Sequence, residues 1–381
     1  VADVVRSFPA EAGPALRWEP LVTEQPGFDD AVEPSRPSRA PAIPSDVPAP
    51  AASRSSPPDG LVPALLKRAR DVARRLLGVP ARDRLVPALR AYTRFMPRGS
   101  GKSALWRWVI APHFGWLAHD FEASTRFGAR LRGNTQDFIQ RHVYYFGLWE
   151  PNLTAFLARR LRPGDVFIDV GANIGYFALQ AARLLGPTGS VVAIEASPSI
   201  YDMLTRNLAL NGARNVRAVN VAVADRPSML QLFRGPIDNC GGTSLVVDGT
   251  PGSTFECVVR AEPLGEIVSA EEWRRARLVK IDVEGAEADV VAGMLPLLAR
   301  APRDLELVVE IAPDMLEKQG KRPEDVLKIF RAAGFHAYRI ENDYTAASYL
   351  NPATARRPTR ITEPLVTQTD VVFSRTDAAV L

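Results

Sequence analysis

The run Asp169-Val170-Gly171-Ala172-Asn173-Ile174-Gly175 lies between two apolar segments of different periodicity. Before it, Val166-Phe167-Ile168 is continuously apolar, which is typical of a strand buried on both faces of a parallel sheet. After it, the segment from Tyr176 to Leu185 is amphipathic with helical spacing. A strand, a glycine turn and a helix in this order predict the start of an open α/β sheet, where a nucleotide-like ligand lies against the helix N-terminus.

The spacing of the glycines restricts which nucleotide this turn can hold. A dinucleotide fingerprint needs Gly-x-Gly-x-x-Gly, but counted from Gly171 the second and third positions are Asn173 and Tyr176. A P-loop fails as well, because no Gly-Lys-Ser/Thr follows. Gly171 and Gly175 still let a ligand lie close to the backbone. A nucleoside with a charged amino acid group fits better, and we predict that S-adenosylmethionine binds to Asp169, Gly171, Asn173 and Gly175.

A second strand supports a nucleoside ligand. The segment Ser190–Glu195 is apolar and ends in an acid. An acid at the end of the second strand commonly accepts hydrogen bonds from the ribose hydroxyls, and we predict this role for Glu195. The alternative is that Glu195 caps the helix that starts near Pro198. Asp169, at the end of the first strand, either meets the ammonium group of the ligand or orients the glycine turn.

Acidic residues also follow a later strand. The segment Arg277–Asp282 has the pattern of a buried strand, and an acid-rich turn then leads into a helix. Asp282 and Glu284 therefore lie at the carboxyl end of a strand, where open α/β sheets build their sites. Acids this close repel one another unless a cation such as Lys280 compensates for their charge. Helix N-termini favour acids, so Glu287 is expected to serve the helix, whereas Asp282 and Glu284 are predicted site residues.

Together these motifs resemble those of the FkbM methyltransferases over about 138–338. The resemblance rests on Glu195 and on four segments: Tyr145–Pro151, Asp169–Tyr176, Asn207–Asn211 and Lys280–Glu287. The glycine turn alone marks many methyltransferases, whereas its combination with the Lys-Ile-Asp-Val-Glu-Gly-Ala-Glu run is much more specific. The resemblance implies S-adenosylmethionine-dependent O-methylation of a hydroxyl on a polyketide, a saccharide or another secondary metabolite.

Methyl transfer from a sulfonium to a hydroxyl sets requirements for the site. The donor is already activated, so the protein mainly aligns the nucleophile and excludes water, and a general base typically adds about 10²–10⁴-fold in rate. The candidates for the base are Asp282, Glu284 and His142, although a lone histidine is more often structural. Asp282 alternatively holds a divalent cation that orients acceptor oxygens. The sequence offers no dedicated ligand cage, so no metal ligand is assigned and metal dependence stays open.

Length and composition are ordinary for a soluble globular chain. The 381 residues are 46% hydrophobic and 24% charged, which suits one large domain with additions. Cys240 and Cys257 form neither a disulfide framework nor a metal-site spacing, which predicts a reducing, cytoplasmic location. No apolar run reaches the length of a membrane span, and the start lacks the basic and apolar regions of a signal peptide.

Four regions are expected along the chain. Residues 1–60 hold 12 of the 32 prolines and are predicted to be a disordered tail rich in Pro, Ala and Ser. Residues 61–118 combine helical apolar spacing with 12 Lys and Arg against two Asp. They form either a helical cap on the catalytic domain or a docking surface for an acidic partner or a membrane. Residues 119–150 are expected to be a hairpin and a helix that lead into the active site, and 151–375 the methyltransferase domain.

Strand and helix patterns alternate within the last region. Strands are expected near 166–170, 191–195, 216–221, 278–282, 305–311, 335–340 and 370–374. Helices are expected near 151–161, 174–185, 198–211, 286–299 and 323–333. This alternation predicts an α/β fold with a doubly wound, mostly parallel, seven-stranded Rossmann-like sheet. The glycine-rich loop Asn239–Ser244 is expected either to line the acceptor pocket or to be a mobile surface turn.

Other functions compete with a methyltransferase that acts on a small-molecule or glycan hydroxyl. A nucleic-acid methyltransferase is suggested by the basic segment, but such amino-methylases usually carry Asn/Asp-Pro-Pro-Tyr after the fourth strand. This chain has Asp282-Val283-Glu284-Gly285 there, and these acids repel phosphate. A non-catalytic nucleotide-binding module would be expected to have a damaged cofactor turn, yet the turn residues are all present. A nicotinamide oxidoreductase is disfavoured by Asn173 and Tyr176.

Overall fold

The computed structural model describes residues 79–97, 100–114, 118–235, 254–350 and 355–381. All of them belong to one structural unit of the chain, Gly60–Leu381. The predicted tail over 1–60, the beginning of the basic segment and the glycine-rich loop Asn239–Ser244 lie outside the described residues. The interpretations of those segments therefore remain predictions.

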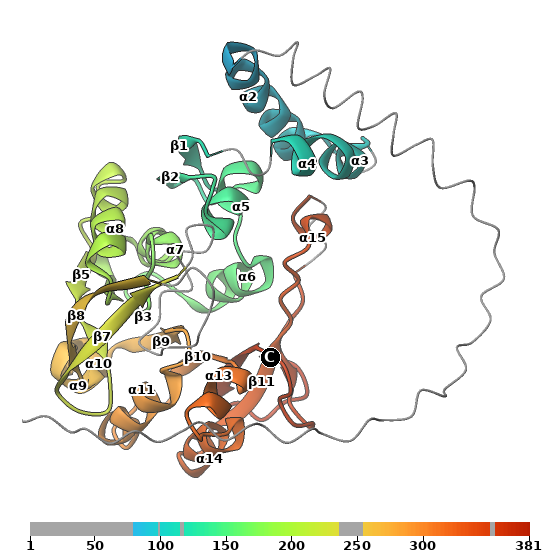
Figure 1. Ribbon diagram of the computed structural model, residues 1–381. Helices are drawn as coiled ribbons and strands as arrows, with labels where there is room; N and C mark the ends of the chain where they lie inside the picture. The colour runs from blue at the N-terminus through green and yellow to red at the C-terminus, as the bar shows by residue number, and fades with distance from the viewer. Residues whose placement is uncertain (1–78, 98–99, 115–117, 236–253, 351–354) are drawn as a thin grey trace, which may run out of the picture. The chain divides into compact units, whose positions relative to one another are not determined.

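A single large sheet organises the described residues (Figure 1). Its strands, in spatial order, are β12 (Thr359–Arg360), β11 (His336–Ile340), β13 (Thr369–Ser374), β10 (Glu306–Ile311), β9 (Ala276–Ile281), β3 (Val166–Val170), β4 (Ser190–Glu195) and β5 (Val216–Asn220). The five strands from β10 to β5 pair in parallel, and β13 lies antiparallel between β10 and β11. The predicted doubly wound, mostly parallel α/β fold is confirmed.

The sheet has one strand more than the seven predicted. The additional strand, β12, is two residues long and pairs with the edge strand β11 through Tyr338 and Arg360. A two-residue strand carries no hydrophobic alternation, so periodicity cannot reveal it. The extra strand covers the outer edge of the sheet and does not change the order of the other seven.

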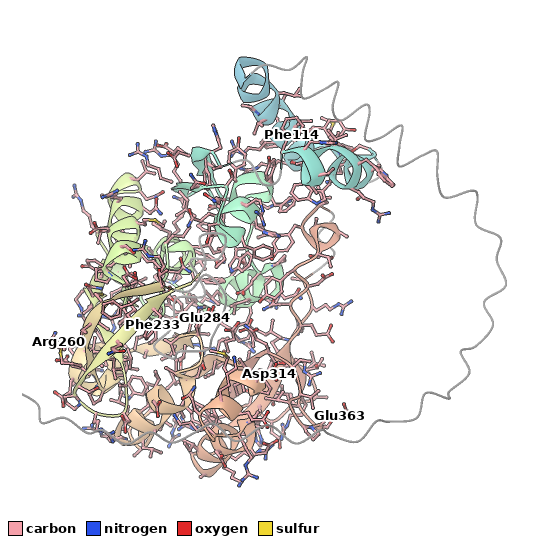
Figure 2. The ribbon with its side chains drawn as sticks, viewed as in Figure 1. Phe114, Phe233, Arg260, Glu284, Asp314 and Glu363 are labelled. Atoms are coloured by element: carbon pink, nitrogen blue, oxygen red, sulfur yellow. The ribbon has the colours of Figure 1, made fainter. Side chains whose placement is uncertain are left out.

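Alternation along the strands separates two apolar cores, one on each face of the sheet. Figure 2 draws the described side chains on the ribbon. On β3, Phe167 belongs to the first core and Ile168 to the second, because successive side chains point to opposite faces. The first core is covered by α5 (Phe138–Phe146), α6 (Pro151–Arg160), α7 (Tyr176–Leu185) and α8 (Pro198–Leu210). The second is covered by α9 (Leu264–Ile267), α10 (Ala270–Arg274), α11 (Glu287–Gly293), α12 (Leu295–Leu298), α13 (Pro313–Lys318) and α14 (Pro323–Ala332).

The helix predicted over 286–299 is divided into α11 and α12, which is a correction to the sequence interpretation. Two residues explain the break. Pro296 lacks the N–H that would bond to the preceding turn. Gly293 lies so close to the earlier segment around Ala224 that a Cβ there would be 2.4 Å from the Ala224 carbonyl oxygen. The apolar spacing continues through this break, which is why periodicity alone suggested one helix.

Short elements precede the sheet. They are α2 (Val79–Phe95), α3 (Lys102–Leu105), the π-helix η1 (Trp106–Ile110), α4 (Ala111–His113) and the hairpin of β1 (Asp120–Ser124) with β2 (Arg130–Asn134). The hairpin turns at Gly128, which has a φ of 87°. On α2, Val86 is buried in the first core, and Arg90 Nε donates a hydrogen bond of 2.8 Å to the Tyr144 carbonyl. The described part of the basic segment therefore packs on α5, in line with the helical cap. Docking on an acidic partner or a membrane stays a prediction.

The remaining elements flank the main sheet. Strands β6 (Ala222–Val223), β7 (Ser228–Arg234) and β8 (Thr254–Glu262) form a small second sheet in the order β6-β8-β7. In the chain, the 3-10 helix η2 (Gly186–Thr188) follows α7, and α15 (Ala346–Leu350) comes after β11 and before β12. Among the described residues, no helix combines the length and apolar composition that a membrane crossing requires.

The first glycine of the turn after β3 is needed for close packing of the backbone. Gly171 has a φ of 79°, and a Cβ at this position would lie 1.8 Å from the carbonyl oxygen of Asp282. The Asp282 N–H in turn donates a hydrogen bond of 3.0 Å to the Val170 carbonyl. The glycine turn and the end of β9 are therefore in direct contact through their main chains, and only glycine permits this approach.

Gly171→Ala is expected to lower the free energy of unfolding more than Gly334→Ala does. The two glycines have nearly the same φ, 79° and 80°, but nothing lies within 4 Å of a Cβ at Gly334. Strain in the left-handed region should cost about 1–2 kcal/mol in both variants. Only Gly171→Ala adds overpacking, which costs about 1–3 kcal/mol more. Urea unfolding measures the difference, and equal losses would contradict the close contact with Asp282.

Candidate active site

The carboxyl ends of β3, β4 and β9 surround a pocket, here called the turn pocket. The predicted residues Gly171, Asn173, Glu195, Asp282 and Glu284 all line it. Its apolar walls include the side chains of Ile139, Ile194, Val221 and Leu232. The two segments that the sequence singled out, 113 residues apart between Asp169 and Asp282, thus meet at one site because parallel strands end at the same edge of the sheet.

Glu195 links the glycine turn to the start of α8. One carboxylate oxygen accepts a hydrogen bond of 2.8 Å from the Asn173 N–H, and the other accepts one of 3.0 Å from the Ser197 N–H. Ser197 itself caps α8, since its side chain accepts a hydrogen bond from the Ile200 N–H. Burial raises the pKa of Glu195 to about 7, although the two backbone hydrogen bonds oppose this. Glu195 therefore holds the loop before α8 through hydrogen bonds and also lines the turn pocket.

Asp169 and Gly175 lie beside the turn pocket rather than in its wall. Asp169 is buried, and neither carboxylate oxygen has a hydrogen-bond partner of good geometry among the described residues. Its register partner on β9 is Lys280. Gly175 caps α7 with a φ of 91°, and a Cβ there would lie 2.7 Å from Leu204. Gly175 thus supports helix packing, and contact of Asp169 with a ligand stays a prediction.

Lys280 is a buried cation at the centre of the acidic groups. It is 4% exposed, and its Nζ lies 2.8 Å from Asp282 Oδ2 and 5.4 Å from the centre of the Phe177 ring. Burial alone would lower the pKa of Lys280, but Asp282, Asp169 and Glu150 raise it above its usual value. Lys280 is therefore charged and partly compensates for the acids around it.

Strand register places further acids beside Asp282. Glu310 is level with Asp282 across the parallel pair of β9 and β10, because Ile281 pairs with Val309. Glu310 is also directly opposite Asp370 in the antiparallel pair of β10 and β13. We call Asp282, Glu310 and Asp370 the acidic row. Like charges that face each other across a sheet destabilise it, so this row needs compensation.

The members of the acidic row differ in their partners. Asp282 has the ion pair with Lys280, and Asp370 accepts a hydrogen bond from the Asn342 side chain. Glu310 is 8% exposed, and its carboxylate has no hydrogen bond or ion pair with another described residue. Burial raises the pKa of Asp370 to about 7, and Asp282 adds to this. Burial and then Asp282 raise the pKa of Glu310 well above its usual value.

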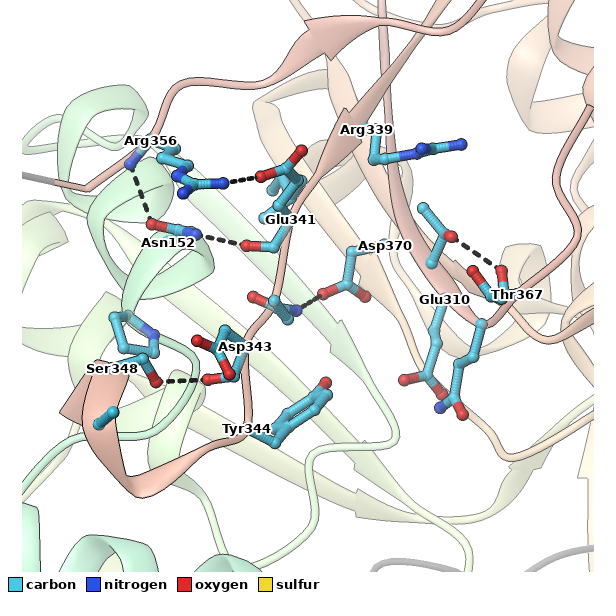
Figure 3. Close-up of a pocket in the computed structure, with 16 residues that line it drawn as sticks. Asn152, Glu310, Arg339, Glu341, Asp343, Tyr344, Ser348, Arg356, Thr367 and Asp370 are labelled. Atoms are coloured by element: carbon cyan, nitrogen blue, oxygen red, sulfur yellow. Dashed lines mark hydrogen bonds and ion pairs between the residues drawn. The ribbon is translucent and has the colours of Figure 1, made fainter. Parts of the chain in front are cut away.

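A second pocket opens on the other side of the acidic row, and we call it the C-terminal pocket. It has a volume of about 610 Å³ and is formed by α6 and by the ends of β10, β11 and β13, a size typical of ligand sites. Figure 3 shows the side chains of Glu310, Asp370 and Tyr344 around it. Tyr344 donates a hydrogen bond of 2.9 Å to the buried Glu150. Most of its lining side chains carry hydrogen-bonding groups.

Backbone strain is concentrated at these pockets. Among the described residues, the non-glycine residues with positive φ are Glu150 (39°), Asn173 (49°) and Glu284 (51°). Asn173 and Glu284 line the turn pocket, and Glu150 meets Tyr344 at the C-terminal pocket. Such conformations cost about 1–3 kcal/mol each and cluster at functional sites. Their positions therefore support the assignment of the site independently of the charges.

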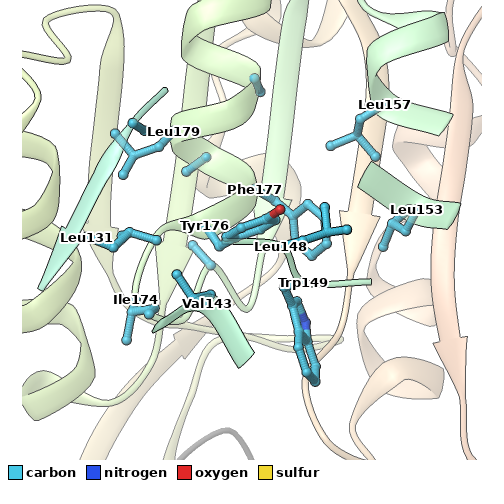
Figure 4. Packing of buried hydrophobic residues seen from close by; sticks show 14 of the residues in the cluster. Leu131, Val143, Leu148, Trp149, Leu153, Leu157, Ile174, Tyr176, Phe177 and Leu179 are labelled. Carbon is cyan, nitrogen blue, oxygen red and sulfur yellow. The ribbon is translucent and has the colours of Figure 1, made fainter. Parts of the chain in front are cut away.

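His142 lies in the aromatic core and is not brought to either pocket. Its ring is buried against Phe138, Trp149 and Tyr349, and Nδ1 lies 2.8 Å from the Phe138 carbonyl oxygen. Figure 4 shows Trp149 in this part of the first core. Burial lowers the pKa of His142 to about 4. Ile139 of the same helix does line the turn pocket, so the segment before α6 reaches the site through other residues.

Sequence reasoning missed Glu150, Glu310, Asp370 and Tyr344. Glu150 belongs to a segment that the resemblance includes, but nothing in its local pattern indicates that it interacts electrostatically with Lys280. Glu310 and Asp370 had a usable signal, since each is an acid inside or beside a strand pattern that is otherwise apolar. Their proximity to Asp282 depends on the strand order, which the local patterns do not give.

The turn pocket suits S-adenosylmethionine in its chemistry. Glu195 offers carboxylate oxygens for the ribose hydroxyls, the apolar walls suit an adenine ring, and the surrounding acids suit a sulfonium cation. The space enclosed here is about 70 Å³, below the about 300 Å³ of small ligand sites. The lining side chains must therefore move apart when the whole ligand binds.

Asp169→Asn is expected to change how stability depends on pH in the ligand-free protein. Burial raises the pKa of Asp169 to about 7, with Lys280 opposing the shift, whereas the unfolded value is about 3.9. The folded state thus binds the proton more tightly, and stability contributed by this group falls as the pH rises from about 4 to about 7. At pH 8 the free energy of unfolding of the variant should exceed that of the parent by at least about 1 kcal/mol, and near pH 4 it should not.

Urea unfolding at pH 4.5, 6 and 8 tests this expectation. Asp202→Asn is a matched control, because Asp202 is exposed on α8 and pairs only loosely with Arg206 at 3.7 Å. The control should leave the pH profile unchanged. A variant of Asp169 that is equally destabilised at all three pH values would contradict the predicted linkage.

Comparison with known proteins agrees with this geometry. The family model described as "Methyltransferase FkbM domain" matches residues 169–337, which contain the glycine turn, Glu195 and most of the acidic row. The methyltransferase sdnD of Sordaria araneosa is 30% identical over 225 residues, covering 51% of this chain and 83% of that protein. The 31-O-demethyl-FK506 methyltransferase FkbM of Streptomyces tacrolimicus is 28% identical over 223 residues, covering 52% and 82%.

A third relative comes from an archaeon. The hexuronic acid methyltransferase AglP of Haloferax volcanii is 28% identical over 184 residues, covering 48% of this chain and 69% of that protein. The residues that the family model matches include β4, β5, β9 and β10. The chain therefore belongs to the FkbM family of S-adenosylmethionine-dependent methyltransferases.

Proposed function

We propose that this enzyme methylates a hydroxyl oxygen of a small molecule or glycan rich in hydroxyl groups, with a saccharide favoured over an apolar polyketide. The observation that carries the proposal is the arrangement of two pockets on either side of the acidic row. Asp282 lines the turn pocket, and Glu310 and Asp370 line the C-terminal pocket. A donor in the first pocket and an acceptor in the second would meet at these carboxylates.

The lining of the C-terminal pocket supports a polar acceptor. It includes hydrogen-bonding groups of every kind: carboxylates, amides, hydroxyls and guanidinium groups. The lining residues without a polar side-chain group are Pro151, Ile340 and Ala347, whereas sites for apolar ligands are lined mostly by hydrophobic and aromatic residues. One relative is named for a hexuronic acid and another for the 31-oxygen of FK506. Both names are consistent with an oxygen acceptor, and the polar lining favours the saccharide class for this chain.

The protein's own residues have distinct roles in this proposal. Gly171, Asn173 and Glu195 hold the donor, which when bound supplies a methyl group already activated for displacement by an oxygen. The acceptor hydroxyl must lose a proton, and a carboxylate at the junction of the pockets, Asp282 or Glu284, is positioned to receive it. Lys280 holds the Asp282 side chain in place through the ion pair of 2.8 Å. His142 is not retained as a base, because its ring does not reach either pocket.

A nucleic-acid acceptor is not favoured by the charges of the site. Glu150, Asp282, Glu310 and Asp370 surround the junction of the pockets, with Lys280 as their buried cation. A phosphate backbone would be repelled from this surface, because binding of nucleic acid depends on neutralising phosphates with Lys and Arg. Two basic residues of the described N-terminal segment instead donate hydrogen bonds to main-chain carbonyls, Arg90 to Tyr144 and Lys102 to Met96.

Glu195→Gln is expected to weaken S-adenosylmethionine binding by about 10–100-fold. The change removes the negative charge that accepts hydrogen bonds from the ribose hydroxyls, and a hydrogen bond to a charged group contributes about 1.5–3 kcal/mol. Isothermal titration calorimetry with S-adenosylmethionine measures the loss. Glu272→Gln is the matched control, because Glu272 also accepts charged hydrogen bonds, from Arg217, but lies outside the turn pocket. Equal affinities of the two variants would remove Glu195 from the donor site.

A further inference from the structure

We propose that Asp282, Glu284 and Glu310 bind one divalent cation, Mg²⁺ or Mn²⁺, which holds the acceptor oxygen between the two pockets. This inference rests on the proposed function, because it assigns the ion to the junction of donor and acceptor. One oxygen from each of the three carboxylates lies within 4.8 Å of the other two. Each ligand comes from a different position of the fold: the end of β9, the strained turn after it, and β10.

The distances suit a hard cation with oxygen ligands. Mg²⁺ binds oxygens at about 2.0–2.1 Å, so two ligands on opposite sides of the ion are about 4.2 Å apart. Three oxygens within 4.8 Å of one another lie at most about 2.8 Å from a common centre, so side-chain rotations that move each oxygen by up to about 0.7 Å would bring them onto one ion. An all-carboxylate set suits Mg²⁺, Mn²⁺ or Ca²⁺ rather than a softer metal. Three protein ligands leave three octahedral positions for water and for oxygens of the acceptor.

Glu310 is the observation that distinguishes this cluster from an ordinary group of acids. It is 8% exposed. Its main chain is paired within the sheet, but its carboxylate forms no hydrogen bond or ion pair with another described residue. Its neighbour across β10 and β13 is another acid, Asp370, and its strongest electrostatic influences come from acids, with Asp282 and Glu284 first. A buried carboxylate in such surroundings is costly unless a cation meets it.

Lys280 is not the cation that compensates for the charge of Glu310. Its Nζ is directed at Asp282 Oδ2, at 2.8 Å, and its strongest electrostatic influences are Asp282, Asp169 and Glu150. The second oxygen of Asp282 remains for another cation. Lys280 also lowers the pKa of Asp370 on β13, but it is not among the groups that influence Glu310 most strongly. A divalent ion among Asp282, Glu284 and Glu310 would compensate for the charge of Glu310.

The position of the ion gives it a function in methyl transfer. Asp282 and Glu284 line the turn pocket, whereas Glu310 lines the C-terminal pocket. An ion held by all three would present its open positions at the junction. A hydroxyl of the acceptor bound there would be oriented toward the donor, and its pKa would be lowered by the nearby positive charge. Two neighbouring oxygens of a saccharide or a hydroxy acid would bind such an ion better than a single hydroxyl.

Mn²⁺ binding to the full chain tests the site without any acceptor. After treatment with EDTA and removal of the chelator, the parent protein should bind one Mn²⁺ per chain, measured by electron paramagnetic resonance of the free ion. Glu310→Gln should weaken Mn²⁺ binding at least tenfold. Glu341→Gln is the matched control, because Glu341 lines the C-terminal pocket but pairs with Arg356 outside the cluster. It should change the Mn²⁺ affinity less than twofold.

Folding of the variants is checked by thermal unfolding with and without Mn²⁺. Mn²⁺ should raise the Tm of the parent and of Glu341→Gln, but not that of Glu310→Gln. Glu310→Gln should itself fold, since it removes a buried charge. Absence of stoichiometric Mn²⁺ binding by the parent, or equal binding by Glu310→Gln, would overturn the proposed site.

Failure of this inference can be separated from failure of the proposed function. Methyl transfer to a hydroxylated acceptor at an unchanged rate in EDTA would overturn the metal site and leave the methyltransferase function in place. Stoichiometric Mn²⁺ binding that depends on Glu310, in a protein that methylates no hydroxylated acceptor, would support the metal site and overturn the assigned acceptor. S-adenosylmethionine should still bind in EDTA, because Glu195 and the glycine turn are not ligands of the ion.

Discussion

The site depends on one buried ammonium group. Lys280 lies on the central part of the sheet, beside Asp169 in register and 2.8 Å from Asp282. Without its charge, carboxylates from β3, β9 and the segment before α6 would face one another with little water to screen them. Because β9 is flanked by β3 and β10, this single side chain stands between the two pockets. The charge of the acids nearest β3 is therefore balanced from the middle of the sheet.

Strain and charge are stored at the same place in this fold. The positive φ values of Glu150, Asn173 and Glu284 are maintained by packing and hydrogen bonds elsewhere, such as the bond from the Asn173 N–H to Glu195. The rest of the sheet is apolar and regularly paired, and it supplies the stability that offsets these local costs. A preorganised but costly site on a regular scaffold is what catalysis by alignment requires.

The features that could be predicted from the sequence are those that a few adjacent residues define. These are the apolar run before Asp169, the glycine turn and the acid at Glu195, and the structure brings them together. Glu310 and Asp370 were missed because their proximity to Asp282 arises from strand order and register. His142 was placed near the site from its position in the chain, but sequence position does not fix which side of α5 faces the pocket. The break of the helix at Gly293 was hidden by apolar spacing that continues through it.

The antiparallel direction of β13 has a consequence for how acceptors can differ among related enzymes. Since β13 runs against β10, its first residues reach the edge where the other strands end. The loop that enters β13 therefore forms part of the C-terminal pocket, through Thr367, Gln368 and Thr369. That loop is remote from the glycine turn, which lies three strands away on β3. Substitutions or insertions in it can reshape acceptor specificity while donor recognition is left intact, so that the two halves of the sheet can diverge separately.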